Sequence, residues 1–128
     1  PLVVKNIMRN KKIKLHDKGE PIRNWLHASD TAQAVILLIP KNVKNEIFNV
    51  AGGFEQANIE TVKKILEHYF EGKGSLDDHV DFSSNRRGQD MRYALNDAKL
   101  KALGWSPQKN FDDEIGEIVT YYRENFIW

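Results

Sequence analysis

Apolar side chains change their spacing repeatedly along this chain, and this restricts the fold more than any other feature of the sequence. Long stretches with the three- and four-residue spacing of a half-buried helix occupy residues 30–39, 58–69 and 111–122. Short stretches that are typical of strands occupy residues 13–16, 22–27, 46–50 and 80–82. Helices interspersed with strands this short predict an α/β fold, a small mixed domain of helices with short strands.

Polar residues and proline mark the ends of the helical stretches. Ser29 is a candidate N-cap for the first long helix, which Pro40 ends, and Asn58 and Asn110 are placed to cap the next two. The apolar stripe of the first helix consists of Ala32, Val35, Ile36 and Ile39. Weaker helical patterns occupy residues 2–9 and 96–104.

Composition narrows the class of protein. A chain of 128 residues is long enough for one domain with a real core, so residues 1–128 are predicted to form a single domain. The net charge of +1 gives no electrostatic basis for binding nucleic acid or a membrane surface, and no apolar run is long enough to span a bilayer. The absence of cysteine excludes a disulfide framework and thiol catalysis, and it fits the reducing cytoplasm. The chain starts without methionine, so we expect it to be part of a longer polypeptide.

Two segments far apart in the sequence set arginine among apolar, aromatic and turn-forming residues. The first spans residues 22–27 and carries Arg23, and the second spans residues 85–93 and carries Arg86. A guanidinium group can hold two oxygens at once and is weakly hydrated, which suits a partly dry phosphate site. The two segments therefore indicate a site for a phosphate-bearing ligand.

The second segment has further features of a binding loop. Arg87 and Arg92 add positive charge, and Gly88 allows close approach of the backbone. Gln89 offers donors and acceptors, while Asp90 can anchor one arginine so that another stays free. The competing interpretation is a solvated basic loop, and for Arg23 it is an exposed arginine stacked on Trp25 of the same strand face. Taken alone, both simpler interpretations are favoured.

Other motifs give no independent chemistry. Gly52 and Gly53 follow a predicted strand but lack the spacing of a dinucleotide fingerprint or a Walker loop. The four histidines lack metal-ligand spacing, and the acidic run at residues 112–114 is typical of the first turn of a helix. The sequence thus predicts no catalytic, cofactor-binding or metal site within the chain.

Taken together, the motifs resemble the C-terminal, substrate-binding region of dTDP-glucose 4,6-dehydratase, a family of the extended short-chain dehydrogenase/reductase (NAD-dependent epimerase/dehydratase) superfamily. The likeness covers essentially the whole chain, in order and with compatible spacing. It is carried by residues 22–30, 46–53, 58–62, 86–95, 103–107 and 122–128. Related epimerases and decarboxylases share a looser form of this pattern.

The resemblance implies a role for several residues. Arg23 matches an arginine that contacts the substrate diphosphate, and Asn58 matches an asparagine on the nucleotide side of the pocket. Residues Asn85 to Gln89 (Asn85, Arg86, Arg87, Gly88 and Gln89) match a loop that closes over the nucleotide, with Arg86 facing the diphosphate. The remaining match, a strand against the nucleobase, consists of Lys14, Leu15 and His16. We expect Arg23, Asn58 and Arg86 to meet in one cleft.

The sequence departs from the family at four of these positions. Arg87 and Gln89 stand where proline and histidine are usual, and Lys14 and His16 stand where proline and tyrosine are common near the base. These departures leave the preference for nucleobase and sugar open, and thymidine in particular is not fixed by the sequence.

The resemblance also implies what the whole protein does. Family members bind NAD, oxidise the sugar at C4, eliminate water across C5 and C6, and return the hydride to C6, and the full-length enzyme is expected to be a homodimer. The resemblance assigns the Gly-rich NAD turn and the Tyr-x-x-x-Lys pair of these enzymes to an N-terminal Rossmann domain. The chain alone is therefore expected neither to bind NAD tightly nor to turn over a nucleoside-diphosphate sugar.

Three hypotheses remain open from the sequence. The chain is the substrate-binding lobe of a sugar-nucleotide dehydratase or epimerase, with an exposed apolar patch where the missing domain makes contact. Alternatively, it is a non-catalytic nucleotide-binding module. A nucleic-acid interaction domain that uses Arg86, Arg87 and Arg92 is the weakest of the three, because the net charge is close to zero.

Overall fold

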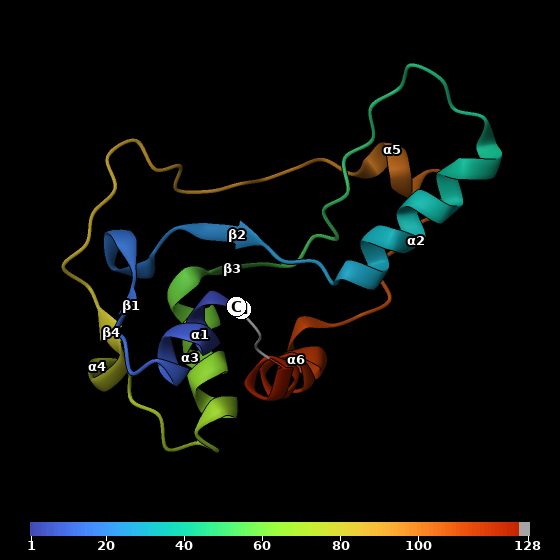
Figure 1. Ribbon diagram of the computed structural model, residues 1–128. Coiled ribbons are helices and arrows are strands. Elements are labelled where there is room, and N and C mark those ends of the chain that lie inside the picture. The colour runs from blue at the N-terminus through green and yellow to red at the C-terminus, as the bar shows by residue number, and fades with distance from the viewer. Residues whose placement is uncertain (126–128) are drawn as a thin grey trace.

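The computed structural model of the chain describes residues 1–125, and residues 126–128, which end the last stretch of family likeness, lie outside them. Helices alternate with very short strands (Figure 1). In chain order the elements are α1 (Leu2–Met8), β1 (Ile13–Lys14), the 3-10 turn η1 (His16–Gly19), β2 (Ile22–Asn24), α2 (Ala28–Leu38), the 3-10 turn η2 (Ile39–Lys41), β3 (Glu55–Ala57), α3 (Asn58–Tyr69), α4 (Leu76–His79), β4 (Val80–Asp81), α5 (Ala98–Lys101) and α6 (Phe111–Asn125).

The strands form two separate ribbons. β1 pairs in parallel with β4, so that Ile13 lies opposite Val80. β2 pairs antiparallel with β3, so that Arg23 lies opposite Gln56. The expected mixed α/β fold of helices and short strands is confirmed.

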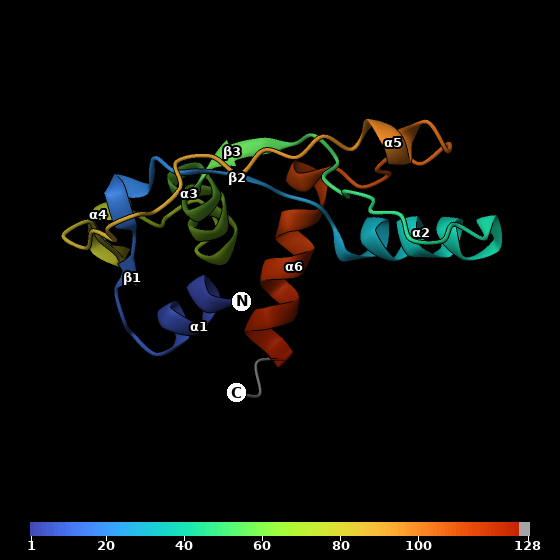
Figure 2. The same cartoon turned by 90° about the horizontal axis from the view of Figure 1, so that it is seen from above.

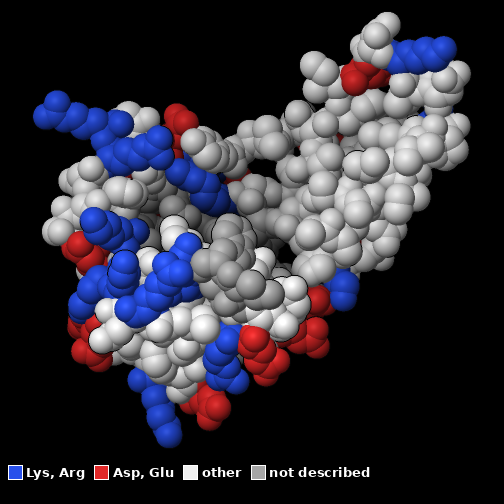
Figure 3. All heavy atoms as spheres, in the orientation of Figure 1, with Lys and Arg blue, Asp and Glu red and all other residues white. Residues whose placement is uncertain are grey.

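The chain divides into a body and an arm (Figures 1 and 2). The body consists of residues 1–25, 54–93 and 110–125, and the arm consists of residues 26–53 and 94–109. Figure 2 shows α2 and α5 side by side in the arm, to one side of α6, while α1 and α3 lie on the other side of α6. The space-filling view in Figure 3 shows lysine and arginine gathered over the body, whereas the visible face of the arm carries charge mainly at its tip.

The body has a continuous apolar interior. One cluster joins Leu66 of α3, which is fully buried, to β1 and β4 through Ile13 and Val80. A second cluster joins α1, α3 and α6 through Val4 and Val119. The helix expected at residues 58–69 is confirmed as α3, whose Val62 and Leu66 are buried and whose Ile59 and Tyr69 pack against these clusters.

The arm has a smaller core. Ala34 of α2, Leu100 of α5 and Trp105 are its buried members, and partly buried residues pack around them. Asp30, only 1% exposed, ties the two sides of the arm together, because its carboxylate accepts hydrogen bonds from the backbone N–H groups of Gln108 (3.0 Å) and Lys109 (3.1 Å).

The predicted apolar stripe of the first long helix faces outward in this structure. Val35, Ile36 and Ile39 are 55%, 64% and 73% exposed. The buried side of α2 is instead formed by Asp30 and Ala34, with Leu37 and Leu38 packed against the arm core. This helix is apolar on both faces, so one apolar face is left without a cover among the described residues.

The predicted strand at residues 46–50 is wrong for this structure. The segment forms no strand, and Ile47 is 84% exposed. Hydrogen bonds from side chains, rather than a neighbouring strand, hold this segment. Lys99 Nζ donates to the Ile47 carbonyl (3.1 Å), and Asn49 Nδ2 donates to the Asn96 carbonyl (3.0 Å). A strand exists only with a partner backbone, and no strand lies beside this segment within residues 1–125.

Two of the three predicted helix caps need correction. α2 begins at Ala28, and the side chain of His27, not Ser29, is the cap, since its Nδ1 accepts from the Ser29 N–H (3.2 Å). Asn58 is the first residue of α3 and makes no capping hydrogen bond. The cap of α6 is confirmed, because Asn110 Oδ1 accepts from the backbone N–H of Asp112 (2.8 Å).

Candidate functional site

Three segments that are far apart in the sequence meet at Ile22. On one edge, Ile22 pairs with Ala57 of β3. On the other edge, its N–H donates to the Met91 carbonyl (2.7 Å), its carbonyl accepts from the Tyr93 N–H (3.3 Å), and it forms a parallel bridge with Arg92. The pair of strands β2 and β3, which we call the ribbon, is therefore bordered by residues 91–93 along the other edge of β2.

Arg23 lies on β2 in the middle of this ribbon and is partly buried. Its Nη1 donates to the Ile22 carbonyl (2.7 Å), and its guanidinium carbon lies 4.1 Å from the centre of the Tyr93 ring. The predicted aromatic stack is thus present, but its partner is Tyr93. Trp25 instead packs edge-on against Phe111 of α6, with ring centres 5.6 Å apart.

The carboxylate that anchors an arginine of the second segment is not the one that the sequence predicted. Arg92 is held by Glu55 of β3 through two hydrogen bonds of 2.8 and 3.1 Å, which raise the pKa of Arg92. Asp90 has no ion pair with any residue in the described part of the chain. The prediction that Asp90 does this work is wrong, because the β2–β3 pairing brings Glu55 next to residues 91–93.

Asn58 follows the ribbon directly. Its backbone N–H donates to the Pro21 carbonyl (3.0 Å), which fixes the start of α3 against the residue before β2. Gly19 makes this close approach possible, since its φ is +78° and a Cβ there would lie 2.8 Å from the Ile59 Cβ. Arg23 and Asn58 are therefore supported by the same short piece of backbone.

The three residues that were expected to form a strand against the nucleobase differ in how deeply they are buried. Leu15 is 7% exposed and belongs to the body core. Lys14 is exposed beside Asp81, whose pKa is lowered by hydrogen bonds from Ser83 and, to a smaller extent, by the charge of Lys14. His16 is half-buried, and its Nδ1 lies 3.0 Å from the Ser84 hydroxyl.

Residues 85–89 lie in the loop that connects β4 to residues 91–93. Asn85, Arg86, Arg87 and Gly88 are exposed, and Gln89 is half-buried. The loop is attached near both ends, by the contact between Ser84 and His16 and by the hydrogen bonds of residues 91–93 to Ile22. Arg86 precedes Met91 by five residues, a stretch of chain that reaches at most about 18 Å.

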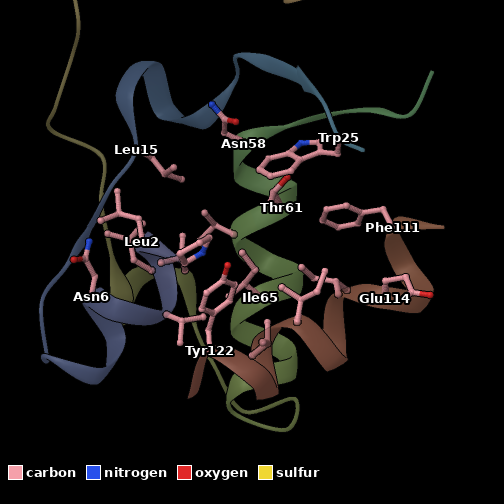
Figure 4. Close-up of a pocket in the computed structure, with 18 of the residues that line it drawn as sticks. Leu2, Asn6, Leu15, Trp25, Asn58, Thr61, Ile65, Phe111, Glu114 and Tyr122 are labelled. Carbon is pink, nitrogen blue, oxygen red and sulfur yellow. The ribbon is translucent and has the colours of Figure 1, made fainter. Parts of the chain in front are cut away.

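A cleft of about 830 Å³ opens between α1, α3 and α6, and Figure 4 shows the side chains that line it. Lys14, Leu15, His16 and Asn58 are among its lining residues. Arg23 and residues 85–89 are not, so Asn58 is the one residue of the expected trio Arg23, Asn58 and Arg86 that lines this cleft.

The walls of this cleft are mainly apolar and aromatic. In Figure 4, Trp25 and Phe111 lie on one side, Leu2 and Leu15 on the other, and Tyr122 at the far end. The indole N–H of Trp25 is buried and has no hydrogen-bond acceptor among the described residues.

The glycine pair at residues 52–53 has a structural role in the arm. The Gly52 N–H donates to Asp97 Oδ2 (3.0 Å), and a Cβ at Gly52 would lie 2.7 Å from Leu26 Cδ1. These glycines precede β3 and not a helix, so they do not form the phosphate-binding turn of a dinucleotide site. In residues 1–125 no group of acidic or histidine side chains is arranged to hold a metal ion, and no helix is long and apolar enough to cross a membrane.

Comparison with known proteins identifies the family. The family model described as GDP-mannose 4,6 dehydratase matches residues 1–118. The chain belongs to this family. The expected resemblance to 4,6-dehydratases of the extended short-chain dehydrogenase/reductase superfamily is thereby confirmed.

Curated relatives and solved structures agree with the family. dTDP-glucose 4,6-dehydratase 1 of Escherichia coli is 32% identical over 132 residues, which cover all of this chain and 37% of that protein. DesIV, a dTDP-glucose 4,6-dehydratase of Streptomyces venezuelae solved with NAD and TYD bound, superposes with a TM-score of 0.85 at 31% identity and covers 98% of this chain and 38% of DesIV.

A second structure gives the same alignment. The dTDP-glucose 4,6-dehydratase of Bacillus anthracis, solved in complex with NAD, has a TM-score of 0.82 at 30% identity, over 98% of this chain and 38% of that one. The fold is therefore that of the C-terminal lobe of these enzymes, and this family member spans less than two fifths of the length of its relatives.

Sequence reasoning missed two members of the site. Tyr93 was part of a recognised motif without a role of its own, and Glu55 was not singled out. Their partners Arg23 and Arg92 lie 70 and 37 residues away in the sequence. No local pattern signals such contacts, which depend on the pairing of β2 with two other segments.

Proposed function

We propose that this chain is the nucleotide-sugar-binding portion of an NAD-dependent 4,6-dehydratase, and that residues 1–128 form one domain of a longer protein. In the proposed reaction, water is eliminated from a nucleoside-diphosphate hexose to give a 4-keto-6-deoxy sugar. Membership in the 4,6-dehydratase family supports this proposal, as do the names of the relatives that match over the whole chain.

The observation that carries the proposal is the meeting of three segments at Ile22. It brings together β2 with Arg23, β3 with the adjacent Asn58, and residues 91–93, which come shortly after the 85–89 loop. We assign the diphosphate to Arg23 and Arg86, because a guanidinium group can bind two phosphate oxygens at once. We assign the nucleoside to Asn58, because a side-chain amide both donates and accepts hydrogen bonds.

The nucleoside assignment extends to the cleft. Lys14 and His16 line it together with Asn58, whose side chain makes no hydrogen bond to any described residue. These side chains, with Asn85, Arg87, Gly88 and Gln89 from the loop, are the proposed contacts of the base and sugar. dTDP-glucose is the first substrate to test, since several relatives carry that name.

The residues of this chain contribute binding and orientation, not the reacting groups. Holding a diphosphate fixes the attached hexose, and a substrate held in the reactive geometry reacts faster without any new chemical group. NAD and the acid and base are assigned to the part of the protein outside this chain, because the glycines of this chain fit no dinucleotide turn.

The arm supports the existence of that further part. Val35, Ile36 and Ile39 form an uncovered apolar face on α2, and Ile47 is exposed on the neighbouring loop. Contiguous apolar surface of this kind marks contact sites in soluble proteins. We assign it to the missing NAD-binding domain, with which the chain would form a cytoplasmic homodimeric enzyme.

Titration of this chain with dTDP, followed by calorimetry, tests the proposal. We expect saturable binding that weakens about ten- to a hundredfold in Arg23→Ala and in Arg86→Ala, which corresponds to about 1.5–3 kcal/mol for a hydrogen bond to a charged group. Lys5→Ala, on α1, is a control that should leave binding unchanged. Absence of binding by the native chain, or equal affinity in all variants, would contradict the proposal. Dehydration of dTDP-glucose by the chain alone would contradict the division of labour.

A further inference from the structure

The guanidinium group of Arg23 lies over the aromatic ring of Tyr93. The guanidinium carbon lies 4.1 Å from the ring centre, well within the distance at which a cation is attracted to an aromatic face. Tyr93 is 52% exposed, so the ring carries the arginine on one side and is not itself a core residue.

The contact with Tyr93 leaves N–H groups of Arg23 available for a ligand. A guanidinium group stacks through its flat face and donates hydrogen bonds through its N–H groups, which lie in the plane. One N–H, on Nη1, donates to the Ile22 carbonyl at 2.7 Å. The others remain in the plane of the group and are available to two oxygens of a ligand.

The backbone fixes the position of the ring independently of Arg23. The Tyr93 N–H donates to the Ile22 carbonyl (3.3 Å), and the preceding residue, Arg92, is bound to Glu55 on β3 at 2.8 Å. Successive side chains in an extended segment point to opposite sides. Arg92 therefore attaches the segment to β3, while Tyr93 presents its ring to Arg23.

We propose that Tyr93 is a positioning residue for the diphosphate site: its ring holds Arg23 in the orientation that receives the phosphate oxygens of a nucleoside diphosphate. The inference rests on the proposed function and adds to it a residue that does not touch the ligand. An arginine side chain loses much rotamer freedom when it binds, and an arginine that is already stacked has less freedom to lose.

The position of Tyr93 also links two parts of the site. Residues 91–93 are separated from the 85–89 loop by Asp90 alone, so the ring reaches Arg23 only while the segment that ends this loop is paired with β2. Docking of the loop and orientation of Arg23 are then one event.

Three variants measured with dTDP test the inference: Tyr93→Phe, which keeps the ring, Tyr93→Leu, which removes it but stays apolar, and Arg23→Ala. We expect Tyr93→Phe to bind within twofold of the native chain, and Tyr93→Leu to bind about two- to fivefold more weakly, the fold-change that an exposed cation–π contact is worth. In the Arg23→Ala background, Tyr93→Leu should have no further effect.

Thymidine, which lacks the diphosphate, separates positioning from general damage to the fold. Tyr93→Leu should leave the affinity for thymidine unchanged if the ring acts through Arg23, whereas a structural defect would weaken both ligands. If Arg23→Ala weakens dTDP binding and Tyr93→Leu does not, the inference is overturned and the proposed function stands. If the native chain does not bind dTDP, both are overturned.

Discussion

The body and the arm use the same kinds of residues but differ in how completely they bury them. In the body, two apolar clusters connect α1, α3, α6, β1 and β4 on several sides. In the arm, one small cluster lies between α2 and α5, and the outer face of α2 remains apolar and exposed. The body therefore has the packing of an independent domain, whereas the arm lacks a layer of structure over the outer face of α2.

The candidate site lies on the body side of this division. Arg23, Asn58 and Tyr93 are attached to the β2–β3 ribbon, while the arm begins a few residues after β2. In the proposed function, the binding residues therefore lie on the well-packed body and the contact surface on the less completely packed arm. Three experiments compare the two regions directly.

The largest difference is expected for leucine in the two cores. Leu66 in the body and Leu100 in the arm are both 0% exposed, so Leu→Ala is the same chemical change at both. We expect Leu66→Ala to lower the free energy of unfolding by about 2–5 kcal/mol, because the surrounding clusters cannot collapse into the cavity. Urea unfolding followed by circular dichroism measures this loss.

Leu100→Ala should act mainly on the arm. We expect faster amide hydrogen exchange along α2 and a smaller loss of global stability than for Leu66→Ala, since the arm opens without the body. If both variants lower the free energy of unfolding equally and α2 exchanges only on global unfolding, the arm and the body are a single cooperative unit.

We expect an effect of pH of intermediate size at the contact between Asp97 and Gly52, which joins the two segments of the arm. Burial disfavours the charged form of Asp97, but hydrogen bonds from Lys101 and the Gly52 N–H and the charge of Lys101 outweigh it and lower the pKa of Asp97. A carboxylate whose pKa is lower in the folded state stabilises that state above its unfolded pKa, about 4, and the contribution is lost as pH falls below that value.

The Gly52 amide proton reports this loss directly. Its chemical shift should move as Asp97 is protonated at pH values below about 4. Asp97→Asn keeps an acceptor for Gly52 without the charge, so it should abolish the titration. A Gly52 shift that is independent of pH in the native chain would show that this carboxylate does not hold the arm.

Sequence patterns predicted what is local and missed what depends on distant segments. The periodicity of residues 58–69 and 111–122 correctly predicted the helices α3 and α6, and Asn110 was correctly predicted as a cap, because these features depend on residues within one or two turns. Residues 46–50 were predicted as a strand, since composition reveals strand character but not whether a partner strand is present.

The site shows the same division. Arg23 was recognised by its neighbours in the sequence, and a stack of this arginine on an aromatic ring was expected. The sequence did not identify Tyr93 as the ring that contacts Arg23, or Glu55 as the carboxylate that binds Arg92. Both contacts depend on how β2 pairs on its two edges. Such pairing is decided by the whole fold, and a single sequence carries no local trace of it.

The smallest effect on stability is expected on the outer face of α2. Ile36 is 64% exposed and makes little contribution to the arm core, so Ile36→Lys should change the free energy of unfolding by no more than about 0.5 kcal/mol. The same change places a charge between Val35 and Ile39 and should reduce self-association of the chain, measured by sedimentation velocity, because this face is apolar and uncovered. Tyr121→Lys is the matched control, since Tyr121 is 59% exposed on α6 of the body. If Tyr121→Lys reduces association as much as Ile36→Lys, or if neither does, the uncovered face of the arm is not the contact surface, and the contrast between the two regions is one of packing alone.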